Sequence, residues 1–401
     1  MDSPLQRRDA TGTSVVKGNW RGREAVILSN GVVRLTVLRT GGLLAEFGSV
    51  ANDGACSRNL LWESPWSLRT PRSRSDEELQ RLYGDVGAGR FLERFTGHAL
   101  CLDEFGSASD EEVAAGSGLH GEASLVDWSF SEQEHDSVTA TAELPLARLS
   151  VERRFSLCPG ESVIRVEERI TNRSDQARPL HWVQHATVGP PMFGEGALVA
   201  TSAMLGTTAS SMYGERDLLE PAAAFVWPYV PGAHGAMIDL RRPFQERSTG
   251  FVAAVRQPAE REHGFVAAMN SAERVALMYV FAADDFPWLT VWEENDCRQE
   301  YPWDGKVQAR GLEFGTTPLP LGKEIIDAAG PVLGYPTSRR IDSGATVSAR
   351  WIMATATGVS LPSSIDDIVV EDDFLLLASA GEKIRVAARG VASFFVGLEE
   401  A

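Results

Sequence analysis

Two of the seven histidines in this chain, His181 and His185, lie four residues apart in the stretch "LHWVQHATV". On a helix, residues at this spacing are close neighbours and can share a metal ion. The stretch follows the turn-forming residues "TNRSD" and is rich in β-branched and aromatic residues, so it predicts a strand. On a strand the two imidazoles lie about 13 Å apart. The pattern therefore excludes a shared zinc ion and leaves each histidine to transfer protons or to pack in a core.

Two further residues, His120 and Glu313, have side chains and settings that suit acid–base chemistry. His120 lies in "GLHGEAS", where the flanking glycines let the backbone approach a ligand, although many such loops are simple turns. Glu313 lies between Leu312 and Phe314 in the alternating stretch "RGLEFG". A partly buried carboxylate there has a raised pKa that suits a general base, whereas a carboxylate on a solvent-facing side is only hydrated. The pattern leaves both interpretations open.

Other stretches with reactive side chains favour no specific site. The segment "WEENDCRQEYPW" is rich in carboxylates, most of which we expect to face water. The segment "GDVGAGRF" lacks the third glycine of a dinucleotide-binding turn and is not expected to open a helix. Four cysteines occur without a C-x-x-C pair, so neither a zinc ribbon nor a redox motif is predicted. We therefore expect no metal ion and no organic cofactor.

Ten tryptophans are present, and several lie near the candidate residues in the sequence. Trp182 falls between the two histidines of the first stretch, and Trp292 precedes Glu313 in the late part of the chain. Core packing accounts for most indoles in proteins. An indole that lines a cleft can instead hold the apolar face of a sugar ring at little entropic cost.

The net charge of −17, from 38 basic and 55 acidic residues, argues against nucleic acid or an anionic membrane as a partner. The N-terminal residues lack the apolar region of a secretory signal, and no apolar run approaches the length of a membrane-spanning helix. We therefore expect a cytoplasmic protein with reduced thiols.

Alternation of apolar and polar residues dominates the chain and predicts strands. In "VVRLTVLRT", Val33, Leu35 and Val37 share one face, and "SVIRVEERIT" alternates in the same way. Two Ser-x-x-Glu capping boxes, which begin at Ser75 and Ser109, predict short helices in loops. The sequence thus predicts an all-β fold, a large antiparallel β-sandwich with a few short helices in loops.

No shift in composition marks a linker between domains. We therefore expect an N-terminal tail over residues 1–18 and a single domain over residues 19–401.

Four motifs, in order along most of the chain, resemble those of the aldose 1-epimerase (galactose mutarotase-like) superfamily, whose β-sandwich is called a supersandwich. "GRFLERF" resembles the G-R-x-x-N-R segment, with Arg94 as its substrate-contacting arginine, and "LHGEASLVDW" places His120 at the first active-site histidine. In "TNRSDQARPLHWVQHATVG", the catalytic histidine follows the turn asparagine by 13 residues, and counting from Asn172 gives His185. "RGLEFGTTPLP" resembles the late strand that bears the catalytic glutamate, here Glu313.

The chain departs from the family pattern at several places. The family continues its catalytic histidine as H-x-Y-F-N or H-x-Y-W-N, whereas this chain reads "HATVG". Glu93 stands where the motif has asparagine, and Asp239 in "MIDL" is the candidate for the aspartate that holds a sugar hydroxyl. A long insert, "LCLDEFGSASDEEVAAGSG", precedes His120. The resemblance, which is closest to bacterial members of unassigned activity, leaves the sugar open.

The resemblance implies a mutarotase, which interconverts sugar anomers through the open-chain aldehyde. Glu313 would act as the base and His185 as the acid, on opposite sides of a bound sugar. His120 and Arg94 would bind hydroxyls and stabilise charge at the ring oxygen. The further residues expected to contact the sugar are Trp182, Trp292 and Asp239.

Two alternatives remain open. A glycoside hydrolase or lyase-like enzyme on the same fold would need a second carboxylate about 5 to 10 Å from Glu313, for which Glu294 and Glu300 are candidates. A sugar-binding or regulatory protein without turnover is suggested by the missing H-x-Y-F-N motif. In all three cases the partner is a small carbohydrate.

Overall fold

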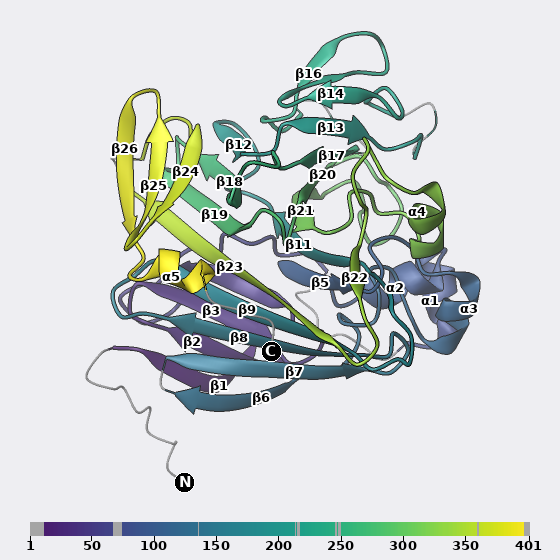
Figure 1. Ribbon diagram of the computed structural model, residues 1–401, viewed down its shortest axis with the longest axis horizontal. Helices are drawn as coiled ribbons and strands as arrows, with labels where there is room; N and C mark the ends of the chain where they lie inside the picture. Colours follow the sequence, from purple (N-terminus) through teal and green to yellow (C-terminus); the bar gives the residue numbers. More distant parts are fainter. Residues whose placement is uncertain are drawn as a thin grey trace.

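The computed structural model describes residues 12–66, 74–134, 136–212, 214, 217–244, 247, 250–358 and 361–396. Two large antiparallel sheets and a few short helices make up this part of the chain (Figure 1). The predicted all-β sandwich is therefore confirmed.

The larger sheet has thirteen strands among the described residues. In sheet order they are β1 (Ser14–Trp20), β2 (Arg23–Ser29), β3 (Val33–Leu38), β4 (Leu44–Ser49), β5 (His98–Leu102), β11 (Trp182–Val188), β21 (Gln308–Gly315), β20 (Trp288–Asn295), β17 (Val252–Arg256), β13 (Leu205–Thr208), β14 (Ala224–Val226), β15 (Tyr229–Pro231) and β16 (Met237–Asp239).

The second large sheet has eight strands within the same described ranges. They are β12 (Ala197–Thr201), β18 (His263–Asn270), β19 (Val275–Ala282), β23 (Thr346–Thr357), β9 (Val163–Asn172), β8 (Leu149–Leu157), β7 (Ser137–Leu144) and β6 (Ser129–Glu134). The other strands are β10 (Arg178–Leu180), which pairs with β22 (Arg339–Ile341), and the three-stranded sheet of β24 (Asp367–Glu371), β25 (Phe374–Ser379) and β26 (Glu382–Ala387). The helices are α1 (Asp76–Tyr83), α2 (Val86–Leu92), α3 (Asp110–Ala115), α4 (Lys323–Ala329) and α5 (Val391–Phe395).

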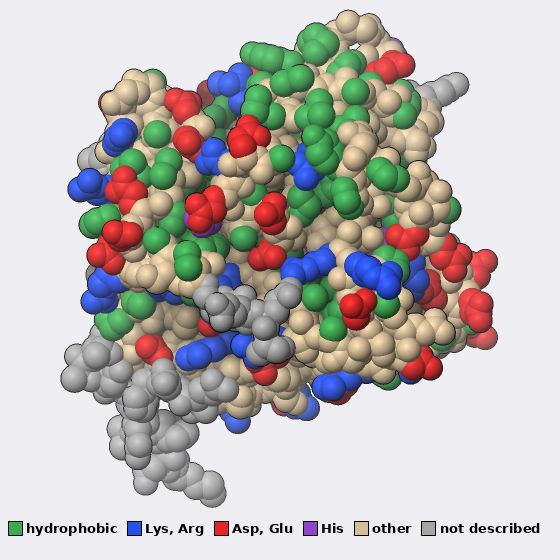
Figure 2. All heavy atoms as spheres, viewed as in Figure 1, with side chains coloured by type: hydrophobic (Ala, Val, Ile, Leu, Met, Phe, Trp, Pro, Cys, Tyr) green, Lys and Arg blue, Asp and Glu red, His purple; other side chains and the backbone are tan. Residues whose placement is uncertain are grey.

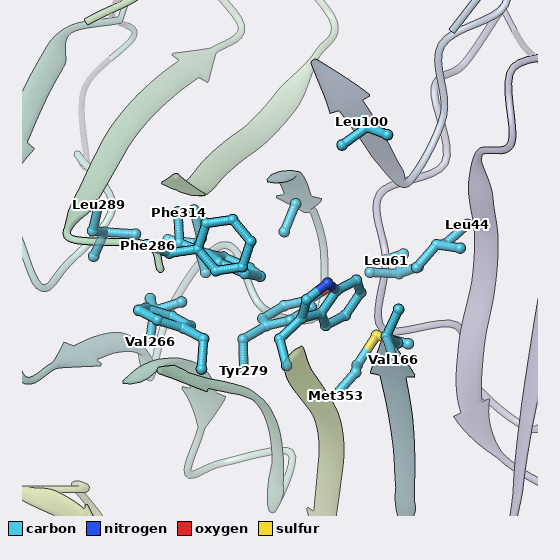
Figure 3. Close-up of a cluster of buried hydrophobic side chains, with 14 of the residues drawn as sticks. Leu44, Leu61, Leu100, Val166, Val266, Tyr279, Phe286, Leu289, Phe314 and Met353 are labelled. Carbon is cyan, nitrogen blue, oxygen red and sulfur yellow. The ribbon is translucent and has the colours of Figure 1, made fainter. Parts of the chain in front are cut away.

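The main core lies between the two large sheets. The alternation predicted for β3 is observed, because Val33, Leu35 and Val37 are all fully buried in this core. Figure 3 shows part of it, with Leu100 of the thirteen-stranded sheet above and Met353 of the eight-stranded sheet below. Each Å² of apolar surface buried there stabilises the fold by roughly 25 cal/mol. Side chains of the thirteen-stranded sheet that point away from this core form its outer face, where a site can be built.

The last part of the described chain adds a third layer. Strands β24 to β26 and helix α5 (yellow in Figure 1) cover the outer face of the eight-stranded sheet. Leu375 and Leu377 of β25 belong to the same buried cluster as Phe265 of β18 and Met278 of β19. This layer therefore lies on the far side of the eight-stranded sheet from β11 and β21.

Both predicted capping boxes are present. The hydroxyl of Ser75 accepts a hydrogen bond from the Glu78 amide at the start of α1, and Ser109 accepts one from Glu112 at the start of α3. The first turns of both helices are acidic, and Figure 2 shows red side chains gathered over this edge of the molecule. No helix in the described residues is long and apolar enough to cross a membrane.

The expectation that "GDVGAGRF" opens no helix is wrong, because α2 begins directly after Asp85. The Asp85 carboxylate accepts a hydrogen bond of 2.7 Å from the Ala88 amide and so caps the helix. Gly89 lets α2 approach α1 closely, since a Cβ there would lie 2.9 Å from the ring of Tyr83. The segment follows a helix and not a strand, so it still does not form a dinucleotide-binding turn.

The sheet begins earlier than the predicted end of the N-terminal tail. Strand β1 starts at Ser14 and pairs with β2 along its whole length, so residues 14–18 belong to the sandwich. Residues 1–11 of the predicted tail lie outside the described residues.

Candidate active site

Strand β11 brings His185 to the middle of the thirteen-stranded sheet. The predicted strand is observed as β10 and β11, which are separated by His181. In β11, His185 lies between Ala99 of β5 and Glu313 of β21 in the strand register. Leu312 and Phe314 point into the main core, so Glu313 points to the outer face together with His185.

The two side chains meet directly. His185 Nε2 lies 3.2 Å from Glu313 Oε1, and the residues are only 5% and 3% exposed. On the other side of the ring, His185 Nδ1 lies 3.0 Å from the hydroxyl of Thr187. The hydroxyl can accept a hydrogen bond from Nδ1–H, and in that tautomer Nε2 is left to exchange a proton with the carboxyl group.

Burial shifts the pKa values of this pair in opposite directions. Loss of hydration raises the pKa of Glu313 to about 8. Loss of hydration first, and the neighbouring His120 second, lower the pKa of His185 well below its usual value. At neutral pH the single proton of the pair therefore rests on Glu313, and the imidazole is neutral. In this resting state only the carboxyl group has a proton to give at the contact, whereas the resemblance implies Glu313 as the base and His185 as the acid.

His120 completes the cluster. Its ring centroid lies 4.8 Å from that of His185, and its Nδ1 lies 2.7 Å from the carbonyl oxygen of Phe105. A carbonyl oxygen only accepts, so Nδ1 carries the proton and Nε2 is left as an acceptor. Burial lowers the pKa of His120 to about 4, which keeps this imidazole neutral. Its backbone adopts φ +65°, an uncommon conformation for a residue other than glycine.

Two phenylalanines from α2 and the turn after it cover the histidines. The ring of Phe95 lies edge-on to His185 at 5.1 Å, and the ring of Phe91 lies edge-on to His120 at 4.7 Å. Phe91 and Phe95 stack on each other at 4.6 Å. These rings exclude water from the pair, which is the physical origin of both pKa shifts.

The two predicted tryptophan contacts have different outcomes. Trp182 is fully buried in the main core, and its indole N–H donates to Glu168 at 2.9 Å, so it cannot contact a ligand at His185. The parity of strand β11 explains this correction, because residues 182 and 185 point to opposite faces. Trp292 is half-buried and pairs in register with Gly311 of β21, over which the carboxylate of Glu313 folds. The register therefore places Trp292 opposite the strand position that the carboxylate covers.

Arg94 and Asp239 are not joined to the cluster by the contacts of the described residues. Arg94 donates to the carbonyl oxygen of Arg90 at 2.8 Å. Asp239 lies on the edge strand β16 and forms an ion pair of 2.7 Å with Arg241. The charge of Asp239 acts on Arg310, and Arg310 is on the core face of β21, opposite to Glu313. Asp239 is therefore not placed to hold a sugar at Glu313.

His181 and the acidic segment after β20 serve other contacts. His181 pairs with Asp327 of α4 at 2.9 Å. Glu294 accepts from two backbone amides and pairs with Arg298 at 3.0 Å, and Glu300 lies exposed in the loop. The described residues contain no group of three or more His, Cys, Asp or Glu side chains that could hold a metal ion.

Behind the pair lies a buried polar network that the sequence reading missed. Glu168 of β9 accepts from Arg153 of β8 at 2.7 Å, from Trp182 at 2.9 Å and from Gln184 at 2.6 Å. Trp182 and Gln184 are alternate residues of β11, so the network holds the strand of His185 in one register against the other sheet. The signal was a glutamate at an inward position of "SVIRVEERIT".

Gly311 is a second residue that the sequence reading missed. A Cβ at this position would lie 2.1 Å from Glu313 Oε1. The missing side chain gives the carboxylate the space in which it contacts His185.

Comparison with known proteins gives a family and a fold. The family model described as "Domain of unknown function (DUF4432)" matches residues 20–304. No curated protein matches the chain.

Three solved structures illustrate the likeness in fold. A proposed aldose 1-epimerase from Escherichia coli K12 has a TM-score of 0.57 at 12% identity, over 86% of this chain and 100% of that chain. Another from Klebsiella pneumoniae has a TM-score of 0.55 at 17% identity, over 86% and 82%. A galactose mutarotase-like protein from Clostridium acetobutylicum has a TM-score of 0.56 at 11% identity, over 86% and 99%. The fold is that of the aldose 1-epimerase and galactose mutarotase-like superfamily, as the motifs predicted.

Proposed function

The chain belongs to the DUF4432 family and has a galactose mutarotase-like fold, and from this premise we propose that it is a mutarotase that interconverts the anomers of a reducing sugar. The observation that carries the proposal is the contact of 3.2 Å between His185 Nε2 and Glu313 Oε1 on a shared, water-poor face. A pair that holds one proton between an acid and a base suits a reaction that moves one proton on and one proton off the same sugar.

Ring opening needs both partners at once. Glu313 donates its proton to the ring oxygen as the bond between that oxygen and C1 breaks, and His185 takes the proton of the anomeric hydroxyl as its oxygen forms the aldehyde carbonyl. Rotation about the C1–C2 bond and the reverse proton transfers close the ring with the other configuration. The ring oxygen and the anomeric oxygen are both bonded to C1. An acid and a base that lie next to each other can therefore reach both oxygens, and they need not lie on opposite sides of the sugar. The cycle returns every proton and needs no oxidant.

The neighbouring residues support these transfers. Glu313 becomes an anion in the open-chain state and His185 becomes a cation, so the two charges form an ion pair that partly offsets the cost of their burial. The Nε2 atom of His120 can accept a hydrogen bond from a sugar hydroxyl. Trp292 lies where an indole can pack against the apolar face of the ring.

The test is the decay of optical rotation after α-glucose, α-galactose and other crystalline anomers are dissolved with the enzyme. We expect Glu313→Gln and His185→Asn each to lose most of the acceleration, at least about 100-fold for a general acid or base. Glu262→Gln and His234→Asn change the same residue types at exposed positions and serve as matched controls. Full activity of both active-site variants would rule out the assignment.

A second function, sugar binding without turnover, is favoured by the enclosure of the pair, since both residues are nearly inaccessible. This function would be supported by a sugar that binds in calorimetry but whose anomers the protein does not exchange. Hydrolysis is disfavoured, because Glu294 pairs with Ala309 in the strand register, four residues or about 13 Å along β21 from Glu313. That separation exceeds the range of paired glycosidase carboxylates.

A further inference from the structure

A cavity of about 620 Å³ lies at the end of strand β11, where Gly189 lines it four residues, or about 13 Å, beyond His185. Its polar and aromatic wall comes from three segments: the chain after β4, the end of β11, and the connection between β20 and β21. The volume is within the range of small-molecule sites, roughly 300 to 1,000 Å³. Its lining includes the side chains of Asn59, Trp62, Glu63, Asp296, Lys306 and Gln308.

The cavity adjoins the outer face of β11, where His185 lies. The backbone amide of Trp62 donates to the carbonyl oxygen of Thr187 at 2.8 Å, and the hydroxyl of Thr187 contacts His185 at 3.0 Å. Thr187 is two residues, or about 7 Å, from His185 along the strand. The ring of Phe95 contacts both Trp62, at 5.5 Å, and His185, at 5.1 Å. One aromatic ring thus stands between the cavity and the pair.

The polar groups of the wall are held in fixed orientations. The amide of Asn59 donates to Glu63 at 3.0 Å, and the amide of Gln308 donates to Asp296 at 3.2 Å. Carboxylates have further lone pairs after these contacts, so they can accept from hydroxyl groups, while the ammonium of Lys306 donates. A wall of alternating acceptors and donors is complementary to a polyhydroxylated ligand.

The charge of the wall favours a neutral ligand. Glu63 forms an ion pair with Arg21, and Asp296 shares the cavity with Lys306. The two carboxylates are thereby matched by two cations. With its charges matched in this way, the wall offers an anionic ligand no net attraction, whereas sugar hydroxyls carry no charge and need none. The indole edge of Trp62 adds apolar surface.

We propose that this cavity binds the sugar unit next to the reacting one, so that the preferred substrate is a reducing disaccharide or longer oligosaccharide and not a free hexose. This inference rests on the proposed mutarotase activity. The non-reducing unit occupies the cavity against Trp62, and the reducing end reaches His185 and Glu313 once the ring of Phe95 turns aside. Binding energy from the remote unit then opens the enclosed pair.

The test compares anomer exchange on glucose and galactose with exchange on maltose, cellobiose and lactose. We expect kcat/KM for at least one disaccharide to exceed that for either hexose by tenfold or more. In Lys306→Met and in Asp296→Ala this ratio falls about tenfold. Lys383→Met removes an exposed lysine on β26 and leaves the ratio unchanged.

Two outcomes overturn the inference: no disaccharide is preferred, or the variants lower hexose and disaccharide rates equally. A second arm separates this failure from failure of the proposed activity. Calorimetry measures binding of the same disaccharides to the wild type, to Glu313→Gln and to Lys306→Met. Binding that Lys306→Met weakens and Glu313→Gln retains, without anomer exchange, supports the cavity and refutes the mutarotase. Anomer exchange on hexoses without any binding of disaccharides supports the mutarotase and refutes the cavity as a sugar site.

Discussion

Gly311→Ala should displace the carboxylate of Glu313, and so lower the rate of anomer exchange, without unfolding the protein. The added Cβ would lie 2.1 Å from Glu313 Oε1 and 3.0 Å from its Cδ. An ordinary contact begins near 3.4 Å, so the carboxylate must move by more than 1 Å. This movement breaks its contact of 3.2 Å with His185.

The magnitude follows from geometry. A displacement of about 1 Å in a catalytic group can cost about 100-fold in rate. The atom that gives way is the far end of a flexible side chain, so the cost in packing is small, and replacing glycine within a strand regains roughly 0.5–1 kcal/mol of backbone entropy. We therefore expect kcat to fall about 100-fold while the free energy of unfolding changes by less than about 1 kcal/mol.

Optical rotation measures the rate, and urea unfolding measures the stability. Gly18→Ala is the matched control, because its Cβ would also meet a flexible side-chain end, Ile27 Cδ1 at 2.7 Å, in strand β1 away from the site. A rate for Gly311→Ala within twofold of the control would show that the position of the carboxylate does not limit the reaction.

Three further predictions concern the pair and the network behind it. Burial raises the pKa of Glu313 from 4.5 to about 8, so between these pH values the folded state holds a proton that the unfolded chain has released. The contribution of this proton to the free energy of unfolding is complete below about pH 4.5 and is lost as pH rises through 8. Urea unfolding should show the wild-type free energy of unfolding fall between pH 5 and 8.5 through this proton. The contribution should be missing in Glu313→Gln, and an unchanged pH dependence in that variant would contradict the raised pKa. Glu168→Leu should cost roughly 3–5 kcal/mol, because Arg153 is left buried and unpaired, and adding Arg153→Met should recover much of the loss; additive losses in a double-mutant cycle would show that the pair is not coupled. Trp182→Phe should cost about 1–3 kcal/mol through the donor lost to Glu168 and leave KM unchanged, whereas a raised KM at full stability would restore Trp182 as a substrate contact.

The features that the sequence predicted correctly are those that local rules determine. Alternation identified β3, and the Ser-x-x-Glu boxes located α1 and α3, because each pattern depends on residues within one turn or one strand. Helix α2 was missed because its glycines have low helix propensity, and close packing against α1 compensates for it.

The site illustrates the limit of local reasoning. Strand parity alone places Trp182 on the face opposite His185, so that error was avoidable. The register that sets His185 against Glu313 joins residues more than one hundred positions apart and depends on the whole sheet. The enclosure by Phe91 and Phe95 depends in turn on where α2 docks, and burial there shifts the pKa values of Glu313 and His185 in opposite directions.

The most direct test of the central claim is magnetisation transfer between the α and β anomeric proton signals of a sugar already at equilibrium, with catalytic amounts of enzyme. This measurement reports ring opening itself and no net reaction is needed. We expect measurable transfer with the wild type at neutral pH and, with Glu313→Gln, transfer no faster than in buffer alone. Equal transfer with the wild type and with Glu313→Gln would contradict the central claim.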